Sequence, residues 1–97
     1  MLEAFVASHP DDAFGLYGLA IECANQNDMA AAQKHFETLL ARHPDYVTGY
    51  FQYGQLLARL SRNQEARSTL TAGIAAAHRT GDSHAADEMQ SALALLP

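Results

Sequence analysis

The chain has 97 residues, of which six are Lys or Arg and eleven are Asp or Glu, giving a formal net charge of −5 at pH 7. This length suits one domain, and an acidic chain without a basic stripe disfavours nucleic acid as a partner. The single cysteine, Cys23, excludes an intramolecular disulfide and suits a reducing compartment. No apolar run approaches the roughly 20 residues of a membrane span, and no signal peptide is recognisable. We therefore expect a cytoplasmic protein that does not associate with membranes.

One tripeptide occurs twice, at a distance that indicates an internal repeat. His9-Pro10-Asp11 and His43-Pro44-Asp45 are identical and stand 34 residues apart, a period typical of helix-turn-helix repeats. When residues 13–46 are laid over residues 47–80, apolar residues match apolar ones and small residues match small ones. The matched pairs include Leu16 with Tyr50, Leu19 with Tyr53, Ala20 with Gly54, Cys23 with Leu57, Ala32 with Ala66, Phe36 with Leu70 and Leu40 with Ile74.

Residues 2–8 precede the first complete unit and predict a partial one. Their apolar residues stand 34 positions before apolar residues of the first unit, so they indicate the second helix of an incomplete repeat; the pairs are Leu2 with Phe36, Phe5 with Leu39 and Val6 with Leu40. A residue before proline is disfavoured in helical backbone, so His9 and His43 should close the helices that precede them.

Each complete unit, residues 13–46 and 47–80, is expected to hold two helices. Apolar residues recur at i, i+3, i+4 and i+7, as on the buried side of a helix, and polar turn residues separate the patterns. The expected helices are Asp12–Asn25, Met29–Arg42, Tyr46–Leu60 and Gln64–Arg79.

Several residues are assigned to the ends and crossings of these helices. Aspartates should cap the helix starts, namely Asp11 or Asp12, Asp28, Asp45 and, for the last helix, Asp82 or Ser83. Ala32 and Ala66 should be buried where two helices cross closely. The second unit has His78 where a closing proline is expected, so its second helix can run one turn longer.

A final helix is predicted after Gly81, a residue suited to the position that follows a helix. It spans about Ser83–Leu95, within residues 83–96. Its apolar stripe is Ala85, Met89, Ala92, Leu93 and Leu96, and its other side carries Asp87, Glu88 and Gln90. A polar outer side is what the end of a helical solenoid requires, so this segment is interpreted as a capping helix.

Over residues 13–80 the chain resembles the tetratricopeptide repeat (TPR) family, with about two full repeats, a preceding half-unit and the capping helix. The matching positions are Leu16, Leu19, Ala20, Ala32, Phe36 and Pro44, and in the second unit Tyr50, Tyr53, Gly54, Ala66 and Leu70. Departures are Leu16 for a usual tryptophan, Cys23 for a tyrosine, and Leu39 and Gly73 for alanines. The resemblance implies an all-α fold, a short right-handed solenoid of antiparallel helix pairs, and a single domain over residues 1–97.

The resemblance also implies protein or peptide binding in a concave groove lined by the first helix of each unit. The residues expected there are Phe14, Tyr17, Ile21, Thr48, Phe51, Gln55 and Arg59. An apolar stripe of this kind indicates an interaction site, or else a surface packed beneath residues 2–8. The alternative function is self-assembly, with the same stripe forming a homodimer or the chain being part of a larger array. A subgroup of the family clamps ligand carboxylates, but Tyr17, Ile21 and Gln52 occupy the positions of its lysine and asparagines, so that clamp is not expected.

The sequence disfavours a J-domain, a metal site, a catalytic nucleophile and a phosphate-binding loop. His-Pro-Asp occurs in J-domains too, but two copies at the repeat period favour a structural role. The five histidines, His9, His35, His43, His78 and His84, include no pair four residues apart, and no second cysteine joins Cys23, so no metal is expected. Cys23 is predicted to be a buried structural thiol, and neither a nucleophile elbow nor a phosphate-binding loop occurs. We therefore expect no catalysis and no cofactor.

Overall fold

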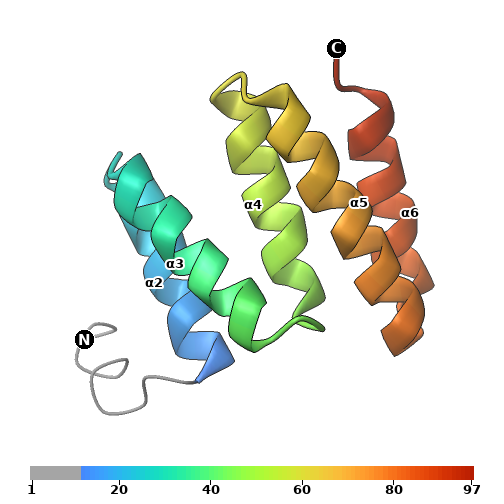
Figure 1. The fold of residues 1–97 in the computed structure, drawn as a ribbon, viewed down its shortest axis with the longest axis horizontal. Coiled ribbons are helices and arrows are strands. Elements are labelled where there is room, and N and C mark those ends of the chain that lie inside the picture. Colours follow the sequence, from blue (N-terminus) through green and yellow to red (C-terminus); the bar gives the residue numbers. More distant parts are fainter. Residues whose placement is uncertain (1–11) are drawn as a thin grey trace. The chain divides into compact units, whose positions relative to one another are not determined.

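The computed structural model describes residues 12–97, in which every regular element is a helix (Figure 1). These helices are α2 (Ala13–Asn25), α3 (Met29–Arg42), α4 (Val47–Arg59), α5 (Asn63–Thr80) and α6 (Ser83–Ala94). The predicted all-α fold is confirmed, and each predicted helix end agrees with the structure to within one residue. The helix predicted at residues 2–8 lies outside the described residues.

The chain divides into two compact units, residues 1–44 and residues 45–97. In the first unit α2 packs against α3, and in the second α5 lies between α4 and α6 and packs against both (Figure 1). The interpretation of residues 1–97 as one domain stays a prediction.

The turns that join α2 to α3 and α4 to α5 have the same backbone geometry. Asn27 and Ser61, which are 34 residues apart, have φ angles of 62° and 60°, in the left-handed region. The next amide in each turn donates to a carbonyl of the preceding helix, from Asp28 to Cys23 and from Arg62 to Leu57, each at 2.9 Å. These bonds satisfy carbonyls that the helix end would leave without a partner. The repeat seen in the sequence therefore extends to the backbone of the turn.

Three aspartates cap helices as predicted. The Oδ1 atoms of Asp12, Asp28 and Asp82 accept hydrogen bonds from the backbone N–H three residues further on, at 2.8, 3.2 and 3.0 Å. Asp45 was expected to cap α4, and that expectation is wrong. Its Oδ1 instead accepts from Arg79 Nε at 3.0 Å, and Tyr46 occupies the cap position without a side-chain hydrogen bond.

Helix α5 has one more turn than its counterpart α3. The two helices begin at equivalent positions, but α5 has 18 residues and α3 has 14, a difference of about one turn. His43 ends α3 ahead of Pro44, whereas α5 has no proline at that point and continues to Gly81, with a φ of 75°. The predicted lengthening is therefore confirmed, and the extra turn carries Arg79.

The core of the first unit follows the predicted pattern. Ala32 is fully buried, and the other buried side chains are Leu16, Leu19, Ala20, Phe36 and Leu39. Cys23 is only half-buried, so the prediction of a buried thiol was wrong. Its neighbours Glu22 and Ala24 are half-buried as well, because this end of α2 is less covered than its middle.

In the second unit, α5 is buried on two sides. Ala66 is fully buried, as predicted, and Gly73 lies between α4 and α6. A methyl carbon placed on Gly73 would lie 2.5 Å from Tyr50 Cβ and 2.5 Å from Met89 Sδ. Glycine therefore permits an approach that any side chain would obstruct.

The wider contact of α5 also buries residues that the sequence pattern did not single out. These are Leu56 of α4, Ala76 of α5 and Ala86 of α6. In α6 the buried side chains are Ala86 and Met89, whereas the predicted stripe residues Ala85, Ala92, Leu93 and Leu96 are half-buried. The polar side predicted for α6 is exposed at Asp87, Glu88 and Gln90.

Candidate interaction faces

The non-core face of α2 combines aromatic and aliphatic side chains. Phe14, Tyr17 and Ile21 are spaced three and four residues apart, which places them on one side of the helix. Phe14 is 70% exposed, and Tyr17 and Ile21 are half-buried. The opposite side of α2 is buried through Leu16 and Leu19. The core of the first unit is thus filled without Phe14, whose ring lies largely in solvent.

Partial burial of Tyr17 affects its phenol group. Removal from water disfavours the phenolate, so it raises the pKa of Tyr17 above its ordinary value. The side chain therefore remains a neutral phenol throughout the physiological range, and it offers an aromatic ring with a polar hydroxyl tip. Side chains of this type are frequent at protein interfaces because one end is apolar and the other hydrogen-bonds.

The corresponding face of α4 is more polar than that of α2. Thr48, Gln55 and Arg59 are exposed, and Phe51 is half-buried among them. The core side of α4 is buried through Tyr50 and Tyr53 and, further along, Gly54, Leu56 and Leu57. Arg59 is the single charged residue of the helix and forms no ion pair with any described residue.

The structure thus places the expected site residues on two helix faces. Phe14, Tyr17 and Ile21 share a face of α2, and Thr48, Phe51, Gln55 and Arg59 share a face of α4. These faces belong to different compact units, and that they line one concave groove stays a prediction. Sequence periodicity identified the non-core side of each helix, but it did not reveal that Phe14 is far more exposed than its neighbours.

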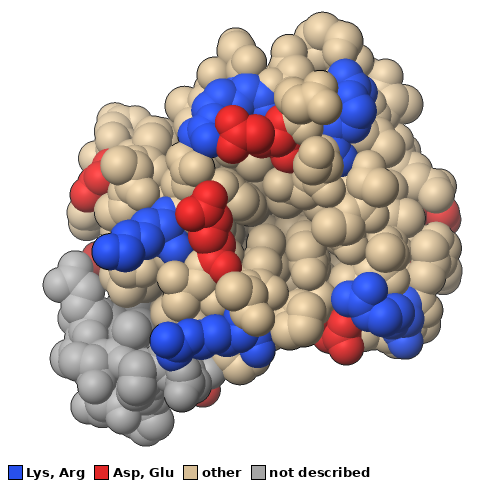
Figure 2. Space-filling model, in the orientation of Figure 1, with Lys and Arg blue, Asp and Glu red and all other residues tan. Residues whose placement is uncertain are grey.

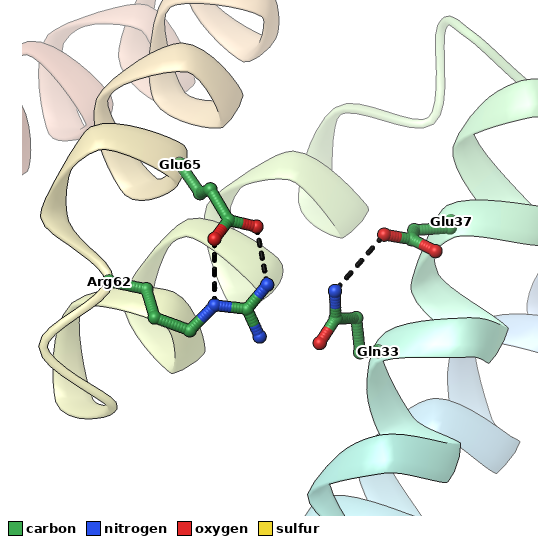
Figure 3. Close-up of polar contacts among 4 residues, drawn as sticks. All are labelled: Gln33, Glu37, Arg62 and Glu65. Carbon is green, nitrogen blue, oxygen red and sulfur yellow. Dashed lines mark hydrogen bonds and ion pairs between the residues drawn. The ribbon is translucent and has the colours of Figure 1, made fainter.

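Two pairs of polar side chains lie within a helix or at its start. Arg62 forms a bidentate ion pair with Glu65 at the start of α5, and Gln33 Nε2 donates to Glu37 Oε2 at 3.2 Å on α3 (Figure 3). The hydrogen bond from Arg62, and then its charge, lowers the pKa of Glu65. On the face drawn in Figure 2, basic side chains lie in separate groups and not in one stripe.

Other kinds of site find no support in residues 12–97. Within that range no three His, Cys, Asp or Glu side chains gather in a group able to hold a metal ion. None of the described helices combines the length and apolar character that crossing a membrane requires. The two helix faces are therefore the best candidates for a functional surface in the described part of the chain.

Comparison with solved structures finds close relatives of this chain. A solution structure of a tetratricopeptide repeat domain protein from Salinibacter ruber is 36% identical, with a TM-score of 0.82, over 87% of this chain and 85% of the other. A crystal structure of such a protein from the same organism is 35% identical, with a TM-score of 0.77, over 84% and 91% of the two chains.

A third similar structure comes from another organism. The solution structure of a protein from Bordetella parapertussis is 28% identical, with a TM-score of 0.79, over 95% of this chain and 80% of that one. No protein-family model matches the sequence, and no curated protein matches it either.

Proposed function

The chain belongs to the tetratricopeptide repeat family and has that family's α-solenoid fold, and we propose that it binds a peptide or a partner helix through the non-core faces of α2 and α4. Repeats of this family are in general protein-interaction scaffolds and are typically non-catalytic. We propose the same for this chain, without a cofactor. We also propose a cytoplasmic location, because its one cysteine suits a reducing compartment.

The observation that carries the proposal is the exposure of Phe14. This side chain is 70% exposed at the start of a face that continues through Tyr17 and Ile21. An exposed aromatic residue beside half-buried apolar ones is costly in water, and such a patch often marks an interaction site. Among residues 12–97 the core does not require Phe14, because Leu16 and Leu19 already fill the inner side of α2.

The face of α4 supplies the polar part of the proposed recognition. Phe51 offers an aromatic ring, and Gln55 and Arg59 follow it at spacings of four residues along the same side of the helix. Arg59 favours a ligand carboxylate or a backbone carbonyl. A bound segment with one or two large apolar side chains would complement the face of α2, and a nearby acceptor would complement the face of α4.

Self-assembly is the second candidate function, and the same exposed aromatic residue supports it. A second copy of the chain could cover Phe14, Tyr17 and Ile21 in a homodimer, or the chain could form part of a longer repeat array. In either case the apolar face has a structural role, and no separate ligand is required.

The test uses peptides selected on the immobilised chain from a random-peptide library. Their affinity is measured by fluorescence anisotropy for the wild type, for the double variant Tyr17→Ala/Phe51→Ala and for Phe14→Ser. Truncated aromatic hot spots should each weaken binding by about 2 kcal/mol or more. Because Tyr17 and Phe51 are half-buried, circular dichroism must show that the double variant retains its helices; the more exposed Phe14 provides the safer substitution.

Light scattering of the same variants separates the two candidate functions. If the wild type is a monomer that binds peptide, and both variants lose this binding, the result supports the scaffold function. A wild-type dimer that dissociates in Phe14→Ser supports self-assembly. If peptide affinity and mass are unchanged in folded variants, these faces have neither role.

A further inference from the structure

The end of α6 departs from the polar character of a capping helix. Leu95 is 85% exposed, and Leu93 and Leu96 beside it are half-buried. Residues 89–97 include no charged side chain, whereas the first half of α6 exposes His84, Asp87 and Glu88. A helix whose outer side must only face water has no need for leucine at this position.

The same end of the second unit is rich in arginine. Residues 59–67, which run from the end of α4 into α5, contain three of the six basic residues of the chain and one acidic residue, Glu65. Leu60, in the turn between these helices, is 38% exposed. Arg67 extends from α5 and donates from Nη2 to the Pro97 carbonyl at 2.9 Å.

That hydrogen bond brings the two segments together. It ties Pro97 to the early part of α5, so the exposed Leu95, which follows α6, lies at the same end of the second unit as Arg67. The end of α6 and the start of α5 share that end (Figure 1). The α4–α5 turn lies at this end as well. We call the surface formed by Leu60, Arg62, Arg67 and Leu95 the arginine–leucine end.

We propose that the arginine–leucine end is a second interaction surface, which binds an acidic protein segment carrying an apolar side chain. The apolar side chain covers Leu95, and a flanking carboxylate approaches Arg67, which donates to a backbone carbonyl and forms no ion pair with any described residue. Charge complementarity selects this occupant: residues 59–67 carry three arginines and one acidic residue, within a chain whose net charge is −5. The surface is distinct from the faces of α2 and α4, so the proposal does not rest on the function proposed above.

A protein segment fits this surface better than a membrane does. The chain as a whole is acidic and is repelled by anionic lipid, which attracts clusters of several basic residues. Here one of the arginines, Arg62, already shares its charge with Glu65. A protein segment with a few carboxylates around one leucine matches the local charge. It does so without bringing the acidic remainder of the chain close to an anionic membrane surface.

The test uses the full chain and two fluorescein-labelled peptides. One peptide has two leucines set among glutamates and glycines, and the matched peptide has lysine in place of every glutamate. Anisotropy is measured for the wild type, for Leu95→Ser/Arg67→Gln and for the control Phe14→Ser. All substituted side chains are exposed, so the variants should fold. Sedimentation with phosphatidylglycerol-containing vesicles and light scattering are run in parallel.

The proposal predicts that the glutamate peptide binds the wild type and the control alike, and binds the double variant at least tenfold more weakly. Binding should also weaken as NaCl rises from about 0.05 M to about 0.5 M, because salt screens exposed charges. The proposal is overturned by no binding, by equal binding of the lysine peptide, or by loss in Phe14→Ser with retention in the double variant. Vesicle capture in place of peptide binding, or a dimer that the double variant dissociates, would assign the surface to a membrane or to a second copy instead.

Discussion

Gly73→Ala tests how closely the three helices of the second unit pack. The added methyl carbon would lie 2.5 Å from Tyr50 Cβ on one side and 2.5 Å from Met89 Sδ on the other. Tyr50 Cβ is fixed to the α4 backbone, so relief requires α4 and α5 to separate. Overpacking typically costs about 1–3 kcal/mol, and alanine regains about 1 kcal/mol of helix propensity over glycine. Because the Tyr50 contact cannot be relieved by a rotamer change, the strain should fall in the upper part of that range, about 2–3 kcal/mol. We therefore expect a net loss of about 1–2 kcal/mol, or about 4–16 °C in Tm.

Gly54→Ala is the matched control for this substitution. Its methyl carbon would lie 2.6 Å from Leu70 Cδ2 and 2.7 Å from Leu70 Cγ, and a leucine side chain can change its rotamer. We expect a smaller loss, of about 1 kcal/mol or less, because helix propensity offsets much of the strain. Thermal and urea unfolding followed by circular dichroism measure both variants.

A double-mutant cycle with Met89→Ala identifies the contact responsible. Shortening Met89 removes one of the two close contacts of the new methyl group, so the double variant should be less destabilised than the sum of the single ones. If Gly73→Ala is as stable as the wild type, or more stable, α4, α5 and α6 do not approach one another as closely as these distances indicate.

Three further predictions concern the core, the cap and the pH dependence. Ala66→Leu should overpack the α4–α5 crossing and cost about 1–3 kcal/mol in thermal unfolding, and a neutral result would show that Ala66 is not at a close crossing. Deletion of residues 83–97 should remove the cover that Met89 provides for Gly73 and cause aggregation or loss of cooperative unfolding; a soluble truncated chain with an unchanged melt would exclude the capping role. Burial raises the pKa of Tyr17 above 10.0, so its contribution to stability is complete below pH 10.0 and is lost as pH rises through the raised pKa. Tyr17→Phe should reduce the loss of unfolding free energy above pH 10.0. If the unfolding free energy of the variant depends on pH as that of the wild type does, ionisation of Tyr17 does not contribute to this loss.

The helices were predictable because their apolar spacing is repeated. Ala32 and Ala66 recur at the same position of a 34-residue unit, and both are fully buried. Asp45 could not be assigned from the sequence, because an aspartate before a helix can cap it or pair elsewhere; here the extra turn of α5 brings Arg79 within reach. Gly73 was recognised in the sequence as a departure from the family pattern. Its close approach to Tyr50 and Met89 depends on how α6 packs on α5, which residue spacing does not give.

The candidate site was predictable to a lesser degree. Periodicity separates the core side of α2 from the side that carries Phe14 and Tyr17, because it fixes angular position around a helix. It cannot give the exposure of each side chain, which depends on what other segments cover it. Phe14 and Tyr17 therefore differ in exposure although they share a face. The exposed Leu95 was unforeseen for the same reason, since the sequence pattern indicated a polar outer side for α6.

Amide chemical-shift mapping shows residue by residue whether a protein ligand binds the non-core faces of α2 and α4. The isotopically labelled chain is titrated with a peptide selected from a random library, and backbone amide shifts are followed by NMR. We expect the largest shifts in residues 14–21 and 48–59, and we expect Phe14→Ser to reduce these shifts in parallel with the loss of affinity. Shifts concentrated on the exposed sides of α3 and α5, with α2 and α4 unaffected, would contradict this expectation.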